Sequence, residues 1–450
     1  MNNNKKKLFD ADVEADELLE KQFALKDKSG FSNILTAVLC LGFIFAFAVM
    51  FWAVPDEKKS ESENRELQQV PSFSLTTLLD GTFTSEFATY MADQFPVRDF
   101  FVGIKGVSET LQLKMENNST FVTRDGYLID RDDYFHVPAP AEGKIDDRIK
   151  ASNIDKNISY ASAFARKMKR ADIDFVCAFA GRKQDVLTDK LPATYGSTYS
   201  DEVWKHITDY SAEKKLDFIN LRDHLRDNYR EGLYYRTDHH WTTEGAYEAY
   251  VKIMEQFGEE PYKEEDFRIE AATNEFYGTT YQAAGVKWVE ADTISYWRYE
   301  GDESFTLRIL DEPDSEGKRN YDGFEGVRFE GDYAVFDGIY VKDYLNVTDK
   351  YSSFIGGNNA YTEIILEGEE RETLVIAKDS FSHCMIPFLA RHYNLVIVDF
   401  RSFNFSVEKL CMSVGADKML VLCNLDTLGQ GNYMGNLRVT TVFDKYILNK

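Results

Sequence analysis

Cysteine is scarce in this chain of 450 residues: there are five, and no two of them form a C-x-x-C pair. The absence of that spacing excludes a zinc ribbon, and an odd number of unpaired cysteines does not suggest a disulfide framework. We therefore interpret the cysteines as small buried hydrophobic residues. The 27 glycines and nine prolines are too few for a collagen-like chain, and 14% aromatic residues argue against wholesale disorder.

Basic residues are also in deficit, because 52 Lys and Arg against 76 Asp and Glu leave a net charge of −24. This surplus of acid would repel a phosphate backbone, so we expect no binding to nucleic acid. It also disfavours broad docking on an anionic membrane surface. The sequence contains no Walker loop, dinucleotide-binding fingerprint, EF-hand loop or G-x-S-x-G elbow. We therefore predict neither a cofactor nor a resident metal ion.

A long apolar run stands out near the N-terminus, where residues 33–54 include no charged side chain. As a helix this run spans about 33 Å, which matches a bilayer core of about 30 Å. A cleaved signal peptide would have an apolar stretch of about 7–15 residues close to the start of the chain. Here residues 1–32 precede the run and Pro55-Asp56-Glu57 follows it. We predict an uncleaved transmembrane helix over residues 33–54, in contact with the lipid bilayer.

The distribution of lysine around this run predicts its orientation. Lys5, Lys6 and Lys7 favour a cytoplasmic N-terminus under the positive-inside rule. Residues 1–32 are then a cytoplasmic tail, and the long chain that follows the helix is extracytoplasmic. The protein is expected in the cell membrane with a single pass.

Beyond the apolar run, the hydrophobic pattern divides the chain into two further parts. Residues 55–125 show helical periodicity and light packing. Residues 126–450 alternate helical patterns with short apolar strand-like runs such as 174–180 and 373–378, which predicts an α/β fold with a parallel sheet flanked by helices. Residues from about 259 to 372 are rich in Tyr, Gly, Asp and Thr, and we interpret them as a β-rich insertion in this α/β domain.

Ser380 follows the apolar run 373–378 and precedes a helix predicted over residues 382–393. The carboxyl end of a strand that leads into a helix is where open α/β sheets place ligands. Free N–H groups at such a turn can receive an oxyanion. A serine hydroxyl is a weak nucleophile, however, and needs a base within hydrogen-bond reach. The alternative is that Ser380 only caps its helix.

The loop Arg236–Trp241 concentrates polar groups just before a predicted helix at residues 242–257. Asp238 and His240 are two residues apart, so the carboxylate can turn toward the imidazole and fix its tautomer. Two alternatives stay open. The loop is a capping and packing loop, or Asp238, His239 or His240 binds a metal ion together with His383, although no H-E-x-x-H spacing supports that.

The string YYRTDHHWTTEGAY at residues 234–247 resembles the signature of the bacterial DHHW protein family. Shorter matches are Phe95-Pro96-Val97-Arg98, Arg124-Asp125-Gly126-Tyr127-Leu128, Lys378-Asp379-Ser380-Phe381 and Asp399-Phe400-Arg401. That family is similar to the SGNH hydrolase-like O-acetyltransferases of alginate modification, which place an Asp-x-His pair before the serine. The resemblance implies an SGNH-like fold, with Ser380 as nucleophile, His240 as base and Asp238 as the group that orients the base.

Other roles implied by the resemblance are less specific. His239 would line the pocket. Asp379 is the residue expected before the serine, whereas Lys378 departs from the small residue that usually precedes it. The Ser380 N–H is one expected oxyanion donor, and Gly278 and Asn424 are candidates for the second. Arg401 would orient the substrate or pair with a structural acid.

The function implied by the resemblance is acyl transfer outside the cytoplasm. A membrane-anchored O-acyltransferase would pass acetyl groups to a cell-surface polysaccharide through an acyl-serine intermediate. A membrane-bound O-acyltransferase (MBOAT) would be its acyl donor partner. Two alternatives remain: an SGNH-type carbohydrate esterase, and a non-catalytic glycan-binding or scaffold protein of envelope assembly. In the last case the aromatic residues Trp288, Tyr296, Trp297 and Tyr299 would stack on sugars.

Overall fold

The computed structural model describes residues 30–60, 65–112, 114–131, 145–191, 197–286, 288–310, 324–325, 328–329, 333–403 and 405–438. Most of the predicted cytoplasmic tail therefore lies outside the described residues. The chain divides into two compact units: Arg65–Phe101 with the chain up to Ser60, and Val102–Lys450 with the short segment Glu61–Asn64. The boundary between the two units falls inside helix α5 (Arg98–Leu111).

The first unit contains the apolar helix α2 (Gly30–Ala53), which covers most of the run predicted to span a membrane. Among the described residues it is the one helix long and apolar enough to cross a bilayer. Two shorter helices follow, α3 (Leu75–Leu79) and α4 (Thr82–Asp93). Ser74 caps α3 through a hydrogen bond to the Thr77 N–H. Pro96 stands between α4 and α5, because its missing N–H and ring interrupt the helical hydrogen bonds.

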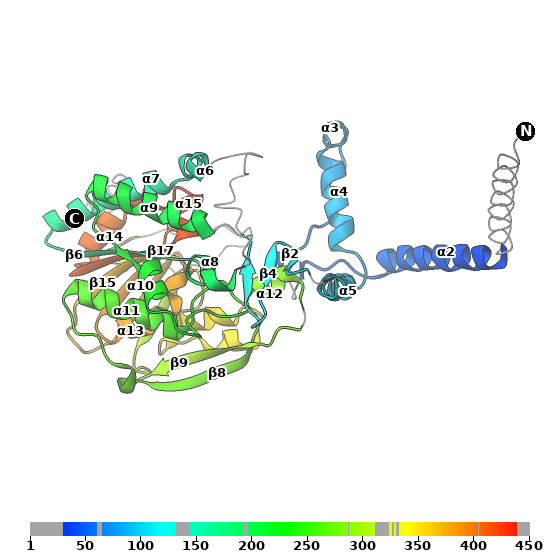
Figure 1. The fold of residues 1–450 in the computed structure, drawn as a ribbon. Helices are drawn as coiled ribbons and strands as arrows, with labels where there is room; N and C mark the ends of the chain where they lie inside the picture. Colours follow the sequence, from blue (N-terminus) through cyan, green and yellow to red (C-terminus); the bar gives the residue numbers. More distant parts are fainter. Residues whose placement is uncertain are drawn as a thin grey trace, which may run out of the picture. The chain divides into compact units, whose positions relative to one another are not determined.

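The second unit is built on an eight-stranded sheet with the order β13-β10-β14-β16-β15-β17-β6-β7. Figure 1 shows helices on both sides of its central strands β15, β17 and β6. Five neighbouring strands are parallel: β16 (Asn394–Asp399), β15 (Thr373–Lys378), β17 (Lys418–Asn424), β6 (Asp174–Ala180) and β7 (Ile219–Asn220). The predicted α/β fold with a parallel sheet flanked by helices is confirmed. Predicted strands 174–180 and 373–378 have the observed bounds, because both are short apolar runs buried on both faces.

Alternate residues of the central strands enter two separate cores. Val176 and Ala178 of β6 belong to one core, whereas Cys177 and Phe179 belong to the other. Helices α10 (Leu221–Asp227), α11 (Thr243–Phe257) and α13 (Ile386–Ala390) cover the first face (Figure 1). Helices α7 (Ile154–Arg170), α9 (Ser197–Lys214), α14 (Val407–Val414) and α15 (Leu425–Gln430) cover the second. Cysteines 177, 384, 411 and 423 are buried, as expected, whereas Cys40 of α2 is exposed, which the expectation for the cysteines did not include.

The β-rich segment at residues 259–372 contributes to the main sheet as well as forming a separate ribbon. Strands β14 (Tyr361–Ile365), β10 (Thr306–Leu310) and β13 (Ala334–Asp337) extend the sheet beyond β16 by antiparallel pairing. Strands β8 (Arg268–Phe276) and β9 (Asp292–Arg298) pair with each other.

The other α-helices and strands of the described residues are short. They are β1 (Lys59–Ser60), β2 (Arg65–Glu66), β3 (Glu116–Asn117), β4 (Thr120–Val122), β5 (Leu128–Asp130), β11 (Phe324–Glu325), β12 (Arg328–Phe329), α6 (Ile145–Ala151), α8 (Lys183–Val186) and α12 (Thr279–Ala284).

The helix predicted after Ser380 is shorter than the sequence indicated. Residues Ser380–Met385 form a 3-10 helix, and α13 covers only Ile386–Ala390. The Asp379 side chain caps the 3-10 turn by accepting from the Phe381 N–H at 3.0 Å. Pro387, at the start of α13, has no N–H to give to a continuous helix. Periodicity alone does not distinguish these two helical forms.

Candidate functional site

The loop with Asp238 and His240 is held in a tight turn before α11. Tyr234 and Trp241 form a bridge across its base, and the Tyr235 N–H donates to the His240 carbonyl at 3.2 Å. The Thr242 hydroxyl accepts from the Gly245 N–H at 3.2 Å and so caps α11. Because α11 begins directly after the loop and is anchored in the core, the loop conformation is fixed at its C-terminal end.

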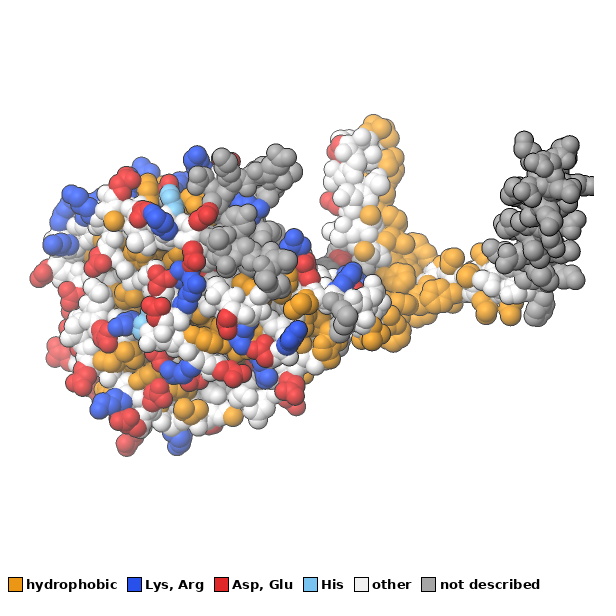
Figure 2. All heavy atoms as spheres, in the orientation of Figure 1, with side chains coloured by type: hydrophobic (Ala, Val, Ile, Leu, Met, Phe, Trp, Pro, Cys, Tyr) orange, Lys and Arg blue, Asp and Glu red, His pale blue; other side chains and the backbone are white. Residues whose placement is uncertain are grey.

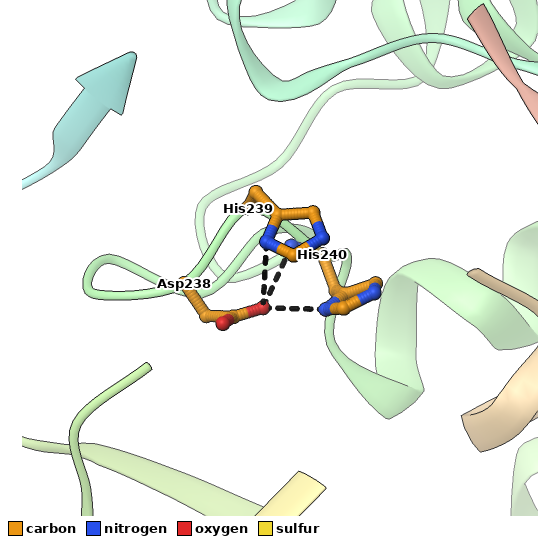
Figure 3. Close-up of side chains that lie close together, drawn as sticks. All are labelled: Asp238, His239 and His240. Atoms are coloured by element: carbon orange, nitrogen blue, oxygen red, sulfur yellow. Dashed lines mark hydrogen bonds and ion pairs between the residues drawn. The ribbon is translucent and has the colours of Figure 1, made fainter. Parts of the chain in front are cut away.

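Asp238 orients His240 through a short hydrogen bond. The His240 Nδ1 lies 2.6 Å from Asp238 Oδ1, which also accepts from the His240 N–H at 2.9 Å (Figure 3). The second carboxylate oxygen accepts from the Thr279 N–H at 2.9 Å and from its hydroxyl at 3.1 Å. Burial alone would raise the pKa of Asp238, but His239, His240 and these hydrogen bonds hold it well below its usual value. The carboxylate is therefore ionised and directed at the imidazole.

Ser380 lies on the other side of the same imidazole. Its Oγ is 2.8 Å from His240 Nε2, although the two residues are 140 positions apart in the chain. Ser380 follows β15 at the carboxyl edge of the parallel sheet, which is where the sequence placed it. The structure thus joins Ser380, His240 and Asp238 in one hydrogen-bonded chain. Ser380 is partly exposed, whereas His240 and Asp238 are buried.

Two aromatic side chains connect the loop to the serine turn. The Trp241 Nε1–H donates to the Phe381 carbonyl at 2.7 Å. The Tyr351 ring stacks on the His240 imidazole at 4.2 Å between centroids, with an angle of 11°. The Tyr351 hydroxyl donates to the Ser380 carbonyl at 3.1 Å. Sequence reasoning missed Tyr351, because it lies in a short 3-10 helix (Lys350–Phe354) that carries no recognisable motif.

Two buried charged residues that the sequence did not single out support the start of the loop. Asp292 accepts from the Thr237 N–H at 2.7 Å, from the Thr237 hydroxyl at 2.6 Å and from the Arg236 N–H at 3.0 Å. The Lys183 ammonium donates to the Leu128 carbonyl at 2.6 Å and to the Arg236 carbonyl at 3.2 Å. Burial lowers the pKa of Lys183 to about 8. Both residues fix the backbone next to Asp238.

Gly278 packs directly against Asp238, whereas His239 lies at the partly exposed side of the loop. A Cβ added at Gly278 would lie 2.2 Å from the Asp238 Cβ, so only glycine allows this close approach. The Gly278 N–H donates to the Thr237 hydroxyl at 3.1 Å, so it is already engaged and is not directed at an oxyanion. His239 is 38% exposed and its Nδ1 lies 2.7 Å from the Thr279 hydroxyl. Partial burial and the adjacent His240 lower the pKa of His239 to about 4, so its imidazole is neutral at pH 7.

Asp379 and Asn424 meet behind Ser380. One Asp379 oxygen accepts from the Phe381 N–H, and the other accepts from the Asn424 N–H at 2.7 Å. The Asn424 side-chain oxygen accepts from the Thr427 N–H at 2.9 Å and caps α15. Asn424 therefore lies at the end of β17, next to the residue that precedes Ser380.

Arg401 pairs with a buried acid, which is one of the two alternatives that the sequence left open. Its guanidinium binds both oxygens of Asp399, at 2.9 and 2.7 Å. The Lys378 ammonium lies 3.2 Å from the same carboxylate and donates to His383 Nε2 at 2.7 Å. Burial lowers the pKa of Lys378 and of His383, while Lys378 and Arg401 outweigh the effect of burial on Asp399 and hold its pKa low.

The alternative of a metal site is not supported by these contacts. Asp238, His239 and His240 offer three ligand atoms within 4.8 Å of one another. However, Asp238 Oδ1 and His240 Nδ1 are 2.6 Å apart and share a hydrogen bond, which a metal with bonds of about 2.0–2.2 Å to each would have to separate. His383, the suggested additional ligand, contacts Lys378 instead. The residues fit a hydrogen-bonded relay better than a metal centre.

Comparisons with known proteins identify a matching family and similar folds. The DHHW protein family matches residues 199–399. A structure of a DHHW family protein from Eubacterium siraeum is 20% identical, covers 72% of this chain and 96% of its own, and has a TM-score of 0.52. Comparison with curated proteins gives no match.

PatB1 from Bacillus cereus is a second similar structure. It is 18% identical, covers 69% of this chain and 97% of its own, and has a TM-score of 0.52. A PatB1 structure with a sulfonyl adduct is 18% identical, covers 70% of this chain and 96% of its own, and has a TM-score of 0.50. At identities of 18–20%, the Eubacterium siraeum protein and PatB1 show that this chain shares their fold.

Proposed function

We propose that this chain, which matches the DHHW protein family over residues 199–399, is a membrane-anchored O-acyltransferase whose α/β domain works outside the cytoplasm. It transfers an acyl group, by our proposal acetyl, to hydroxyl groups of a cell-surface polysaccharide through an acyl-Ser380 intermediate. One observation carries the proposal: His240 lies 2.8 Å from the Ser380 hydroxyl and 2.6 Å from the Asp238 carboxylate. A nucleophile, a base and an orienting acid in this order are the elements of acyl transfer.

The proposed reaction has two steps with the same proton carrier. In the first, Ser380 Oγ attacks the acyl carbonyl while His240 Nε2 takes the hydroxyl proton and delivers it to the departing donor group. In the second, His240 takes the proton from a sugar hydroxyl, the sugar oxygen bonds to the acyl carbon, the bond from that carbon to Ser380 Oγ breaks, and His240 returns the proton to Ser380 Oγ. Asp238 remains ionised throughout and stabilises the imidazolium.

The negative charge on the carbonyl oxygen requires hydrogen-bond donors near Ser380. We assign this role to the Ser380 N–H and to the Asn424 amide NH₂. Two contacts support the assignment: Asp379 binds the Asn424 N–H and the Phe381 N–H, so it fixes the backbone at Asn424 and at Phe381 relative to Ser380. Gly278 instead supports Asp238 by allowing its close approach.

Helix α2 is the proposed membrane anchor, with residues 1–32 in the cytoplasm and the α/β domain outside. The described residues include one helix long enough to span a bilayer, and one helix by itself gives an acyl group no path across it. We therefore propose that a membrane-bound O-acyltransferase (MBOAT) partner supplies the acyl group, and that the polysaccharide is the acceptor. Neither role calls for a cofactor bound to this chain.

A carbohydrate esterase is the second candidate, because the same relay can pass the acyl group to water and Ser380 is partly exposed. The non-catalytic alternative has less support. Three of the aromatic residues proposed to stack on sugars pack instead: Tyr296 and Trp297 are buried and Tyr299 is half-buried, leaving Trp288 as the exposed one.

An aryl acetate assay tests the proposal and separates the candidates. We expect the protein to release 4-nitrophenol from 4-nitrophenyl acetate, and to release it faster when oligosaccharides are added, with acetylated sugar detected by mass spectrometry. Release that oligosaccharides leave unchanged, without acetylated sugar from any member of a glycan panel, indicates an esterase. If neither aryl release nor sugar acetylation exceeds that of a Ser380→Ala variant, the protein is not an acyltransferase. The PatB1 sulfonyl adduct suggests sulfonyl fluorides as a second probe.

Tyr351 gives a graded prediction within this mechanism. Tyr351→Phe removes the hydrogen bond to the Ser380 carbonyl, worth about 1 kcal/mol, and should lower kcat about fivefold with KM unchanged. Tyr351→Leu also removes the ring stacked on His240 and should reduce kcat further. Steady-state aryl acetate hydrolysis measures both effects. The matched control is Tyr247→Phe, which removes a hydroxyl bound to the Tyr262 carbonyl away from the site and should leave kcat unchanged. Equal effects of the two Tyr→Phe variants would contradict a positioning role for Tyr351.

A further inference from the structure

The first unit exposes an unusual amount of apolar surface directly after α2. Nine large apolar side chains between residues 70 and 101 are exposed: Val70, Phe73, Leu75, Leu78, Leu79, Met91, Phe95, Val97 and Phe100. Figure 2 shows hydrophobic side chains along one side of α4 as well as over α2. Soluble monomeric proteins rarely expose an apolar patch of this kind, so the patch indicates contact with a partner or a membrane.

Ring contacts with Phe47 show at which level along α2 this apolar surface lies. The Phe47 ring stacks on Phe95 at 5.4 Å and contacts Phe101 at 5.5 Å between centroids. Phe47 is six residues before the end of α2 at Ala53, or about 9 Å along the helix axis. If α2 crosses a hydrocarbon core of about 30 Å, Phe47 lies inside that core near one surface. Phe95 and Phe101 then lie at the same level.

Helix α4 continues the apolar surface away from α2. Phe51 of α2 contacts Tyr90 at the C-terminal end of α4 at 5.7 Å. From Tyr90 the ring contacts continue along α4 to its start and on to the segment before α3: Phe87, Phe83 and Phe73, at successive distances of 5.9, 5.7 and 5.2 Å. In Figure 1 the axis of α4 runs across that of α2. A helix with this direction and a row of aromatic rings suits the interface of a membrane that α2 crosses.

The charges of the segment favour apolar insertion over headgroup attraction. No Lys or Arg occurs between Glu66 and Arg98, whereas Asp80, Glu86 and Asp93 do. Asp93 is buried and accepts from the Gln68 N–H at 2.9 Å. Arg98 is the one Lys or Arg in residues 70–101, so electrostatic attraction to anionic phosphates is small and binding should depend weakly on salt.

We propose that residues 70–101, the interfacial segment, lie in the outer surface of the bilayer that α2 crosses, with their exposed apolar side chains in the lipid. This rests on the membrane anchoring included in the proposed function. It assigns a role to the Phe95-Pro96-Val97-Arg98 motif: the turn between α4 and α5 inserts apolar side chains, while Arg98 extends its guanidinium toward the headgroups.

Site-directed spin labelling of the full chain tests this proposal. Cys40 is exposed and the other four cysteines are buried, so a Cys40→Ser background leaves no described thiol accessible to label. Labels are then placed at Phe100→Cys and Leu78→Cys in the segment, with Ile44→Cys in α2 as the lipid control and Lys169→Cys as the water control, all exposed positions. In dioleoylphosphatidylcholine vesicles, positions 100 and 78 should relax several-fold more with oxygen than with a water-soluble nickel chelate, as position 44 does. High salt should not change this.

Three other outcomes would overturn the proposal, each in a distinct way. If positions 100 and 78 respond to nickel as position 169 does while position 44 responds to oxygen, the segment is in water but the anchor stands. If position 44 also responds to nickel, α2 does not cross the membrane and that part of the proposed function fails. If positions 100 and 78 respond to nickel in pure lipid vesicles but to neither reagent in native membranes, the surface binds a protein rather than lipid.

Discussion

Replacing Ser380 by alanine should abolish acyl transfer, lowering kcat by about 10³–10⁶-fold. The variant lacks the oxygen that the His240 imidazole contacts and that would hold the acyl group. Stability should change little, because Ser380 is partly exposed and, within the described part of the chain, its hydroxyl makes its hydrogen bond to His240. A double variant Ser380→Ala/His240→Ala should lose no further activity, because the two groups act as a unit.

Labelling with phenylmethanesulfonyl fluoride provides a measurement independent of the unknown acceptor. Ser380 Oγ forms a bond to sulfur, the sulfur–fluorine bond breaks, fluoride leaves and His240 takes the hydroxyl proton. Mass spectrometry should find one sulfonyl group on Ser380 and none in Ser380→Ala. Ser382→Ala is the matched control, because Ser382 is buried and its hydroxyl donates to the Asp379 carbonyl. Labelling in Ser380→Ala equal to that in the unmodified chain would refute the proposed nucleophile.

The largest loss of stability is expected from Asp399→Asn. Asp399 is fully buried and pairs with Lys378 at 3.2 Å and with Arg401 at 2.7 Å. Removing its charge leaves the Lys378 ammonium in the core without a counter-ion, and breaking a buried pair in this way costs about 3–5 kcal/mol of the free energy of unfolding. Urea unfolding followed by circular dichroism measures the change.

The pH dependence of unfolding distinguishes this effect from a simple packing defect. The pKa of Asp399 is held below its ordinary value of 3.8, so its stabilising contribution is present above about pH 4 and is lost as the pH falls below that. Asp399→Asn should therefore lose less stability than the unmodified chain on acidification below pH 4. The matched control, Asp209→Asn, removes an exposed pair with Lys205 and should cost about 0.5 kcal/mol or less. A loss as small in Asp399→Asn would contradict the buried-pair account.

The sequence predicted the elements whose signals are local. The strands at residues 174–180 and 373–378 are apolar runs, and the helix after Thr242 has its cap at Thr242 and its stop at Gly258, which adopts φ +76°. The charge-free run around α2 was equally clear. These patterns depend on neighbouring residues, so they can be recognised without knowing the fold. The DHHW string also indicated which loop to pair with Ser380, through resemblance rather than geometry.

Periodicity could not show how the site is held together. Ser380 and His240 are 140 residues apart, and they meet because β15 occupies the centre of the sheet and Trp241 binds the Phe381 carbonyl. The positions of Tyr351 and Asp292 around the imidazole and its loop have no local signal either. The sequence by itself determined the strands, the capped helix and the long apolar helix α2. Only the tertiary structure decided which side chains surround His240, because contacts between distant residues depend on strand order and packing.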